Sequence, residues 1–241
     1  MDDTCACLYL EHLSPLILTN SLFRYIATYL NLNSCTEQNL PVPVEPVIFN
    51  KFPSAICASG DPIVHPAETA QLDYEVELTI VIGKTGRRIT AENAMSHVAG
   101  FTVAHDVSAR DWQLKKNGNQ WLLGKAIDGF APLGPSIVTP DEVGDVHNLA
   151  LKCIVNGVEL QSGNTSTLVH KTEALIAWIS TFITLRAGDV ILTGTPPGVG
   201  CFRKPPIWLH PGDVVTCEIE KLGSITNTIV ADTFVPTKSY F

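Results

Sequence analysis

Residues 72–78, LDYEVEL, alternate between apolar and acidic side chains along one short segment. Because successive residues of a β-strand point to opposite faces of a sheet, this pattern predicts a strand with one apolar face, while Asp73, Glu75 and Glu77 share the other. Acidic residues are poor strand formers, and like charges on one face repel each other. Two interpretations are equally open on this segment alone: the acidic face lies in water, or it binds a hard cation such as Mg2+ or Ca2+.

A cation site needs a third ligand from a neighbouring strand, because two glutamates at positions i and i+2 grip an ion from one face only. Asp106 is the best candidate, since it follows the apolar run 101–104 at the end of a second predicted strand. A carboxylate at a strand end beside a loop is well placed for a site. The alternative role of Asp106 is to cap a turn or a helix. His105 should face the other way, so it is not expected to be a ligand.

The remaining signals predict a β-rich α+β domain with a few short helices and long loops rich in glycine and proline. Further predicted strands cover residues 151–155, 190–193, 214–219 and 225–230. Helices are predicted over residues 21–32, 90–97 and 173–184. In the last of these, Thr172 is expected to cap the helix and Phe182 to lie in its apolar stripe.

The composition excludes several classes of function. The net charge of −8 without a basic stripe argues against binding to nucleic acid or to an anionic membrane, and no apolar segment is long enough to span a bilayer. The 7 cysteines are scattered and odd in number, which favours reduced thiols in an intracellular protein. The opening Met-Asp-Asp lacks the cationic start of a signal or transit peptide.

Four sequence blocks are informative together: residues 72–78, residues 105–113 (HDVSARDWQ), the pair Gly124-Lys125, and residues 194–200 (GTPPGVG). In order and spacing they resemble the fumarylacetoacetate hydrolase family, from about residue 37 to residue 230. Within the family, the mitochondrial domain-containing proteins of the second type are the most similar group. The resemblance implies a β-rich sandwich or roll, a homodimer, a small oxo-acid substrate and a divalent metal, usually Mg2+ and sometimes Ca2+ or Mn2+. The family's ligand positions correspond to Glu75, Glu77 and Asp106.

The resemblance also implies roles for four other side chains. Lys125 is similar to the family's active-site lysine, and Gln113 to an amide that orients the substrate; from the residues alone, both would be surface side chains. Thr195 lies in a glycine-rich loop, where its hydroxyl and the backbone N–H groups could receive a substrate carboxylate. This loop matches no nucleotide-binding motif. Arg110 either clamps a substrate carboxylate or pairs with an acid of the chain such as Asp111.

The N-terminal segment departs from the family pattern. Family hydrolases carry a His-x-x-Glu dyad that activates water; here Glu37 stands at the glutamate position, but Ser34 replaces the histidine. A serine hydroxyl is far too weakly basic to act as a base near neutral pH. The chain therefore divides into a divergent segment, residues 1–40, and a catalytic domain, residues 41–241.

The expected reaction is keto–enol tautomerisation of oxaloacetate, which needs no activated water. Hydrolysis of a C–C bond in an acylpyruvate or in fumarylacetoacetate is the alternative, with Lys125 and Glu37 as the catalytic residues. A metal-binding pseudoenzyme is the rival from another class. The resemblance favours a mitochondrial location, whereas the visible N-terminus favours the cytoplasm.

Overall fold

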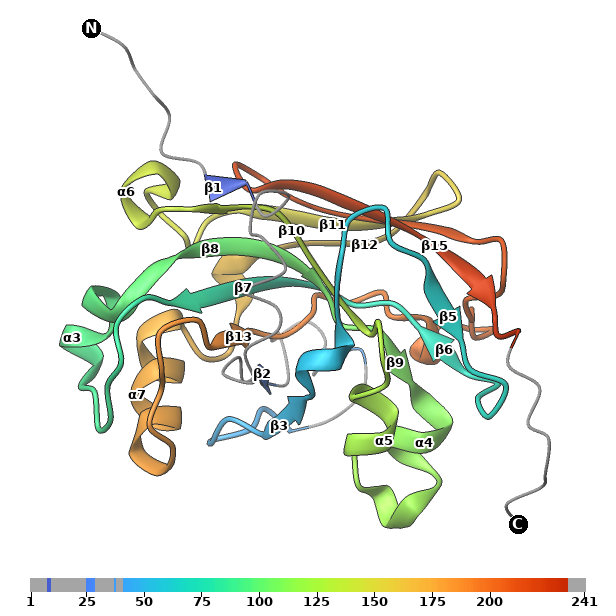
Figure 1. The fold of residues 1–241 in the computed structure, drawn as a ribbon, viewed down its shortest axis with the longest axis horizontal. Coiled ribbons are helices and arrows are strands. Elements are labelled where there is room, and N and C mark those ends of the chain that lie inside the picture. Colours follow the sequence, from blue (N-terminus) through green and yellow to red (C-terminus); the bar gives the residue numbers. More distant parts are fainter. Residues whose placement is uncertain (1–7, 10–24, 29–36, 38–40, 234–241) are drawn as a thin grey trace, which may run out of the picture.

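The structure is a computed structural model that describes residues 8–9, 25–28, 37 and 41–233. Within this part of the chain, eight strands form one mixed sheet in the order β1-β10-β8-β7-β13-β2-β3, with β4 paired to β10 (Figure 1). These strands are β1 (Leu8–Tyr9), β2 (Tyr25–Thr28), β3 (Ile48–Lys51), β4 (Ile56–Ala58), β7 (Val76–Ile82), β8 (Val98–His105), β10 (Ala131–Val138) and β13 (Val190–Leu192).

A second sheet of five strands has the order β12-β11-β14-β15-β5, and β6 pairs with β9 in a separate two-stranded ladder. The strands are β5 (Ile63–His65), β6 (Leu72–Asp73), β9 (Ser108–Ala109), β11 (Ala150–Val155), β12 (Val158–Asn164), β14 (Val214–Ile219) and β15 (Gly223–Ala231). The α-helices of the described residues are short, apart from the last: α3 (Ala91–Ala94), α4 (Arg110–Leu114), α5 (Leu122–Lys125), α6 (Pro140–Val143) and α7 (Thr172–Phe182). Single 3-10 turns cover Pro53–Ala55, Met95–His97, Asn117–Asn119, Thr165–Thr167 and Gly200–Phe202.

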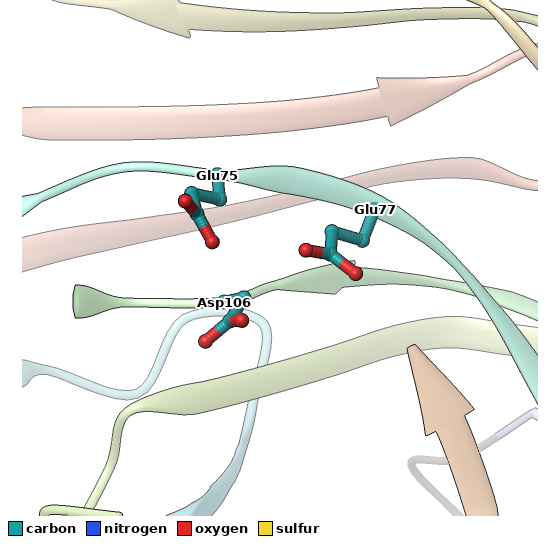
Figure 2. Close-up of side chains that lie close together, drawn as sticks. All are labelled: Glu75, Glu77 and Asp106. Atoms are coloured by element: carbon teal, nitrogen blue, oxygen red, sulfur yellow. The ribbon is translucent and has the colours of Figure 1, made fainter. Parts of the chain in front are cut away.

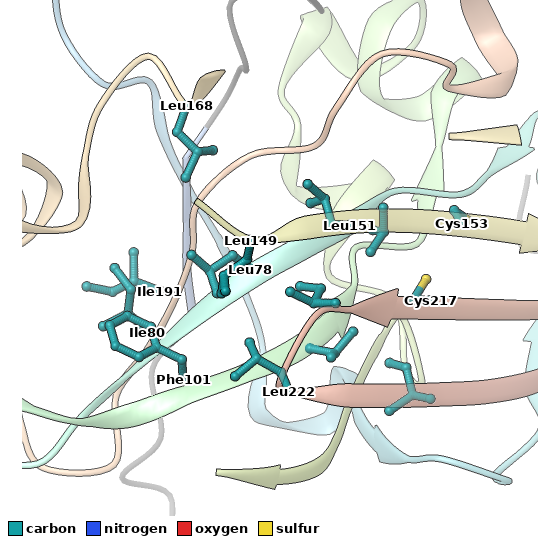
Figure 3. Packing of buried hydrophobic residues seen from close by; sticks show 14 of the residues in the cluster. Leu78, Ile80, Phe101, Leu149, Leu151, Cys153, Leu168, Ile191, Cys217 and Leu222 are labelled. Carbon is teal, nitrogen blue, oxygen red and sulfur yellow. The ribbon is translucent and has the colours of Figure 1, made fainter. Parts of the chain in front are cut away.

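The main hydrophobic core lies between the two sheets. Leu78 and Ile80 of β7 face Leu151 of β11 and Cys217 of β14 across it (Figure 3). The opposite face of the large sheet carries a smaller apolar cluster that includes Ala104, together with the residues of the candidate site. The architecture confirms the predicted β-rich α+β fold, and none of the described helices is long and apolar enough to cross a membrane.

The strands predicted in the C-terminal half are confirmed by β11, β13, β14 and β15. The strand predicted from residues 72–78 is present in two pieces, β6 and β7, which are separated at Tyr74 and Glu75. Both of its faces are buried, so the interpretation of a water-exposed acidic face is wrong. The chain folds back over this face with β3, the glycine-rich loop and α5, which supply partners for the carboxylates.

Two details of the predicted helices are wrong. The helix expected over residues 21–32 is contradicted at Tyr25–Thr28, which form β2 between β13 and β3; pairing on both sides overrides the local preference. The remaining residues of that prediction lie outside the described part. In α7, Lys171 occupies the cap position and Thr172 is the first helical residue, while Phe182 is 59% exposed because the last turn extends beyond the core.

Candidate active site

Two neighbouring strands bring the three predicted ligands together. Glu75 precedes β7, Glu77 lies within it, and Asp106 directly follows β8, its antiparallel partner. The Asp106 N–H donates to the carbonyl of Glu75 at 2.8 Å, which fixes the loop beside the strand. One carboxylate oxygen of each residue lies within 4.8 Å of the other two (Figure 2). The side chains are almost completely buried, and their donor set of oxygens is the type that hard divalent cations favour.

The three carboxylates differ in their electrostatic environment. Burial raises the pKa of Glu77 well above its usual value, and the negative charges of Asp106 and Glu75 raise it further. For Asp106, burial also disfavours ionisation, but the ammonium groups of Lys125 and Lys51 outweigh it and lower the pKa to about 2. The protonation of the cluster therefore depends on which carboxylate has a cation beside it.

Three buried cations surround the acidic cluster. Lys125 Nζ lies 2.7 Å from Glu75 Oε2 and 2.8 Å from Asp106 Oδ2. The guanidinium of Arg110 bridges Glu75 and Asp73, with Nε 2.8 Å from Asp73 Oδ2. Lys51 Nζ lies 2.7 Å from Asp106 Oδ1.

The charges of this cluster leave room for a divalent ion. Four carboxylates (−4) face three cations (+3), so the fully ionised cluster carries −1; a divalent cation changes this to +1. Asp106 Oδ1 is buried and has Lys51 as an ion-pair contact but accepts no well-directed hydrogen bond. An oxygen with spare acceptor capacity in a three-carboxylate cluster fits a metal ligand.

Lys125 and Gln113 are both buried, so the interpretation that they are surface side chains is wrong. They lie on the adjacent helices α5 and α4. Gly124 permits this approach, because a side-chain carbon there would lie within 2.9 Å of Gln113 and of the Ala109 carbonyl. Arg110 donates to Gln113 Oε1 at 2.9 Å and pairs with Asp73 and Glu75 rather than with Asp111.

The glycine-rich loop donates its backbone N–H groups to the chain's own carboxylates. The N–H of Gly194 binds Glu77 Oε2 at 2.7 Å, and that of Gly198 binds Glu37 Oε2 at 3.0 Å. Asp73 accepts the N–H groups of residues 200 and 201 at 2.7 and 3.0 Å. The loop therefore holds the site together, and these four donors are not vacant for a substrate anion. The hydroxyl of Thr195 donates to the Val76 carbonyl at 3.0 Å.

Sequence reasoning missed Lys51, which ends β3 and is 1% exposed. It also gave no separate role to Asp73, which links Arg110 to the glycine-rich loop. The available sequence signal for Asp73 was its place on the acidic face of the predicted strand, beside Glu75 and Glu77. His105 lies opposite Val76 on the core side of the sheet, as expected, and burial together with Lys51 lowers its pKa to about 3. Ser34 lies outside the described residues.

The buried cluster of two glutamates and an aspartate, with a buried lysine beside it on one face of the large sheet, is consistent with a divalent-metal site. Residues 24–230 match the model of the fumarylacetoacetate (FAA) hydrolase C-terminal domain, and the chain belongs to the fumarylacetoacetate hydrolase family. The match begins at residue 24, upstream of residue 37 where the motif resemblance begins, and it includes β2.

Over the aligned region, about three fifths of the residues are identical between the chain and curated relatives. It is 61% identical over 199 residues to the oxaloacetate tautomerase fahd2, mitochondrial, of Xenopus laevis, covering 83% of this chain and 62% of that protein. The identity is also 61% to the oxaloacetate tautomerase FAHD2A, mitochondrial, of Homo sapiens, with 83% and 63% covered. The chain thus spans a little less than two thirds of the length of these relatives.

Solved structures have the same fold. A putative HpcE protein from Mycobacterium smegmatis is 40% identical with a TM-score of 0.82, covering 87% of this chain and 75% of that one. A fumarylpyruvate hydrolase from Pseudomonas aeruginosa, in complex with Mn2+ and pyruvate, is 30% identical with a TM-score of 0.79, covering 88% and 91%.

Proposed function

We propose that this chain is the catalytic part of a divalent-metal-dependent enzyme that interconverts the keto and enol forms of oxaloacetate. The observation that carries the proposal is the buried cluster of Glu75, Glu77 and Asp106 with Lys125 against two of its members. The 61% identical relatives named as oxaloacetate tautomerases support the substrate. In this proposal residues 41–241 form the catalytic domain, and residues 1–40 are a divergent N-terminal segment.

The three carboxylates would hold the metal, and Mg2+ is the first candidate, with Ca2+ or Mn2+ as alternatives. The pyruvate complex of the Pseudomonas relative, which contains Mn2+, supports an ion beside a small 2-oxo acid. A divalent ion at these ligands would supply a Lewis acid for the oxygens of such a substrate. The other requirements of the reaction fall to side chains of the protein.

Tautomerisation moves one proton between C3 of oxaloacetate and the oxygen on C2. Burial disfavours the ammonium form of Lys125, but Asp106 and Glu75 outweigh it and raise the pKa of Lys125 above its usual value. Lys125 is therefore an ammonium at neutral pH. Among the described residues, two of its N–H bonds point to carboxylates; the third would deliver a proton to C3, and the neutral amine left behind would take up the proton that the enol oxygen on C2 releases. The ring of Phe49, 5.0 Å from Nζ, covers the ammonium on one side.

Three further side chains have proposed roles in binding the substrate. The Oε1 atom of Gln113 accepts from Arg110, which leaves the amide Nε2 as the donor for a substrate oxygen. Arg110 directs its guanidinium at Asp73, Glu75 and Gln113, so it acts on the substrate by fixing these groups. Thr195 contributes through its backbone position beside β7, because its hydroxyl hydrogen is directed at Val76.

The test is the decay of enol-oxaloacetate in the presence of Mg2+, followed by ultraviolet absorbance. Glu75→Ala removes one metal ligand and the carboxylate that orients Lys125, so the enzymatic rate should fall to the uncatalysed background. Glu159→Ala, at an exposed position on β12, is the matched control and should keep the wild-type rate. Equal rates in the wild type and Glu75→Ala refute a metal-dependent tautomerase.

Hydrolysis of an acylpyruvate or of fumarylacetoacetate is the second candidate. It is favoured by one contact: the Glu37 carboxylate accepts the N–H of Gly198. This contact brings the acid at the dyad's glutamate position to the glycine-rich loop. With Ser34 at the position of the dyad's histidine, water activation should be weak. Ser34→His should therefore raise acylpyruvate cleavage, and an unchanged rate would count against this second function.

The rival of a metal-binding pseudoenzyme makes a separate prediction. Such a protein would bind Mn2+ with an affinity that depends on Glu75 but would not accelerate either reaction.

We also propose, from its family membership, that the chain assembles as a homodimer. Relatives described as mitochondrial support a mitochondrial location, with the cytoplasm as the alternative.

A further inference from the structure

Lys51 has an unusual environment for a lysine. It is the last residue of β3, and its side chain is completely buried. Nζ donates to the carbonyl oxygens of Val107 at 3.0 Å, Lys125 at 2.6 Å and Phe130 at 2.7 Å. A fourth oxygen, Asp106 Oδ1, lies at 2.7 Å. Since an ammonium has three N–H bonds, four surrounding oxygens saturate it and hold it in place.

The four oxygens belong to segments that meet at the candidate site. Val107 follows the metal-ligand candidate Asp106, Lys125 ends α5, and Phe130 precedes β10. One ammonium therefore fixes the carboxylate of Asp106, the main chain next to it, and the main chain that carries Lys125. Each oxygen of Asp106 contacts a different lysine: Oδ1 contacts Lys51 and Oδ2 contacts Lys125.

The two lysines are not equivalent. Lys125 Nζ hydrogen-bonds to two carboxylates, whereas Lys51 Nζ uses its N–H bonds on backbone carbonyls as well as contacting Asp106. A backbone-bound ammonium cannot move to a substrate without withdrawing its N–H bonds from three carbonyl oxygens in the protein interior, which is costly. Lys51 is therefore fixed during the reaction, and Lys125 is the lysine with a donor to spare.

We propose that Lys51 is a positioning residue: it holds Asp106 in the orientation needed for a metal ligand and holds the main chain that presents Lys125. This proposal rests on the proposed metal-dependent function and adds a residue through which the ligand and the proton donor are aligned together. A group that hydrogen-bonds or ion-pairs with a metal ligand typically changes metal affinity or activity about 10–100-fold when it is removed.

The direction of the change distinguishes positioning from charge alone. If Lys51 acted only as a positive charge near the metal, its removal would reduce repulsion, and Mn2+ would bind more tightly. If Lys51 positions Asp106, its removal leaves Asp106 Oδ1 and three carbonyls without their partner, and Mn2+ would bind more weakly. The two roles therefore predict opposite signs for the same measurement.

The experiment is a Mn2+ titration of the metal-free full chain, read from the electron paramagnetic resonance signal of free and bound Mn2+. Lys51→Met should raise the Kd for Mn2+ by about 10–100-fold and broaden the bound signal. Lys152→Met is the matched control, because Lys152 lies on β11 of the other sheet in a surface pair with Glu218, and it should keep the wild-type Kd. An unchanged or lower Kd for Lys51→Met overturns the proposal.

Two further measurements separate positioning from a general loss of folding. Circular dichroism and thermal unfolding establish that Lys51→Met is folded at the titration temperature; if it is not, Lys51→Gln, which keeps a donor in the pocket, carries the same test. Lys51→Arg keeps the charge, but its planar guanidinium cannot match oxygens placed around a tetrahedral ammonium, so it should also bind Mn2+ more weakly than the wild type. Wild-type affinity in Lys51→Arg would overturn positioning.

Turnover gives an independent readout. In the enol-oxaloacetate assay at saturating Mn2+, Lys51→Met should lower kcat by at least about ten-fold, the lower limit expected when a group that supports a metal ligand is removed. KM should change by less than about three-fold, because a misaligned Lys125 affects the proton transfer more than substrate binding. If wild-type chain binds no Mn2+, both the proposed function and this inference fail. If wild type binds Mn2+ and turns over while Lys51→Met equals it in Kd and kcat, only the inference fails.

Discussion

Asp73 provides the most direct test of how the site is held together. Its side chain is fully buried, and its two oxygens accept four N–H groups. Oδ1 accepts from Tyr74 N at 2.9 Å and Gly200 N at 2.7 Å, while Oδ2 accepts from Arg110 Nε at 2.8 Å and Cys201 N at 3.0 Å. Asp73→Asn has the same shape but places an NH2 group where one oxygen was, so two buried donors would face a third donor.

The expected cost follows from the loss of one partner of a buried ion pair. Removing one member of such a pair destabilises a protein by about 3–5 kcal/mol, because the remaining charge stays buried without compensation. Glu75 still contacts Arg110, so the lower half of this range is expected. For a domain of this size, each kcal/mol lowers Tm by roughly 2–4 °C, which gives a decrease of roughly 6–16 °C for about 3–4 kcal/mol.

The assay is urea unfolding followed by circular dichroism, with thermal unfolding as the second measurement. Asp128→Asn is the control, because Asp128 is exposed on the loop before β10 and should change stability by less than about 0.5 kcal/mol. If Asp73→Asn were within about 1 kcal/mol of this control, four good acceptor contacts would not translate into stability, and the reasoning from buried charge would be refuted.

Three other predictions test different parts of the structure. Gly200→Ala should be destabilising and should impair Mn2+ binding, because its side-chain carbon would clash with the backbone carbonyl of Ile207; a normal Tm would contradict this. Binding of Mn2+ should release protons and strengthen as pH rises, because burial raises the pKa of Glu77 and the Glu77 carboxyl must lose its proton before it can bind a metal. Calorimetry in two buffers of different ionisation enthalpy measures this proton release. Ile179→Ala should cost about 2–5 kcal/mol because Ile179 is fully buried. Phe182→Ser on the same helix should cost less, about 0.5–1.5 kcal/mol, because Phe182 is largely exposed and loses mainly its edge-on contact with Trp178; similar urea midpoints for the two variants would contradict the observed packing.

The three metal-ligand candidates could be predicted from the sequence because their signals are local. The alternation that places Glu75 and Glu77 on one face occupies three residues, and Asp106 is marked by its place at a strand end. Register then decides whether the two strands meet, and β7 and β8 do pair so that Asp106 lies beside Glu75. Such a pattern predicts the arrangement in the folded protein because it depends on strand geometry rather than on distant contacts.

The partners of these ligands could not be predicted in the same way. Lys51 ends an ordinary strand segment, β3, and its ammonium is buried among carbonyl groups that lie 56 to 79 residues away along the chain. The ion pair between Arg110 and Asp73 likewise spans 37 residues, whereas the sequence left open a substrate carboxylate or a nearby acid such as Asp111 as the partner of Arg110. β2 was misread as helix because its strand character comes from pairing with β13 and β3. These features depend on contacts that only the fold creates.

The distribution of cations over the acidic cluster indicates which carboxylate a metal would affect most. Both oxygens of Glu75 and both oxygens of Asp106 contact a lysine or an arginine, whereas Glu77 has no ion pair among the described residues and accepts the N–H of Gly194. That difference explains why the pKa of Glu77 is raised while the pKa of Asp106 is lowered. The chain's own cations therefore compensate two of the three ligands, and a divalent ion would compensate the third, so metal binding and the ionisation of Glu77 are expected to be one coupled event.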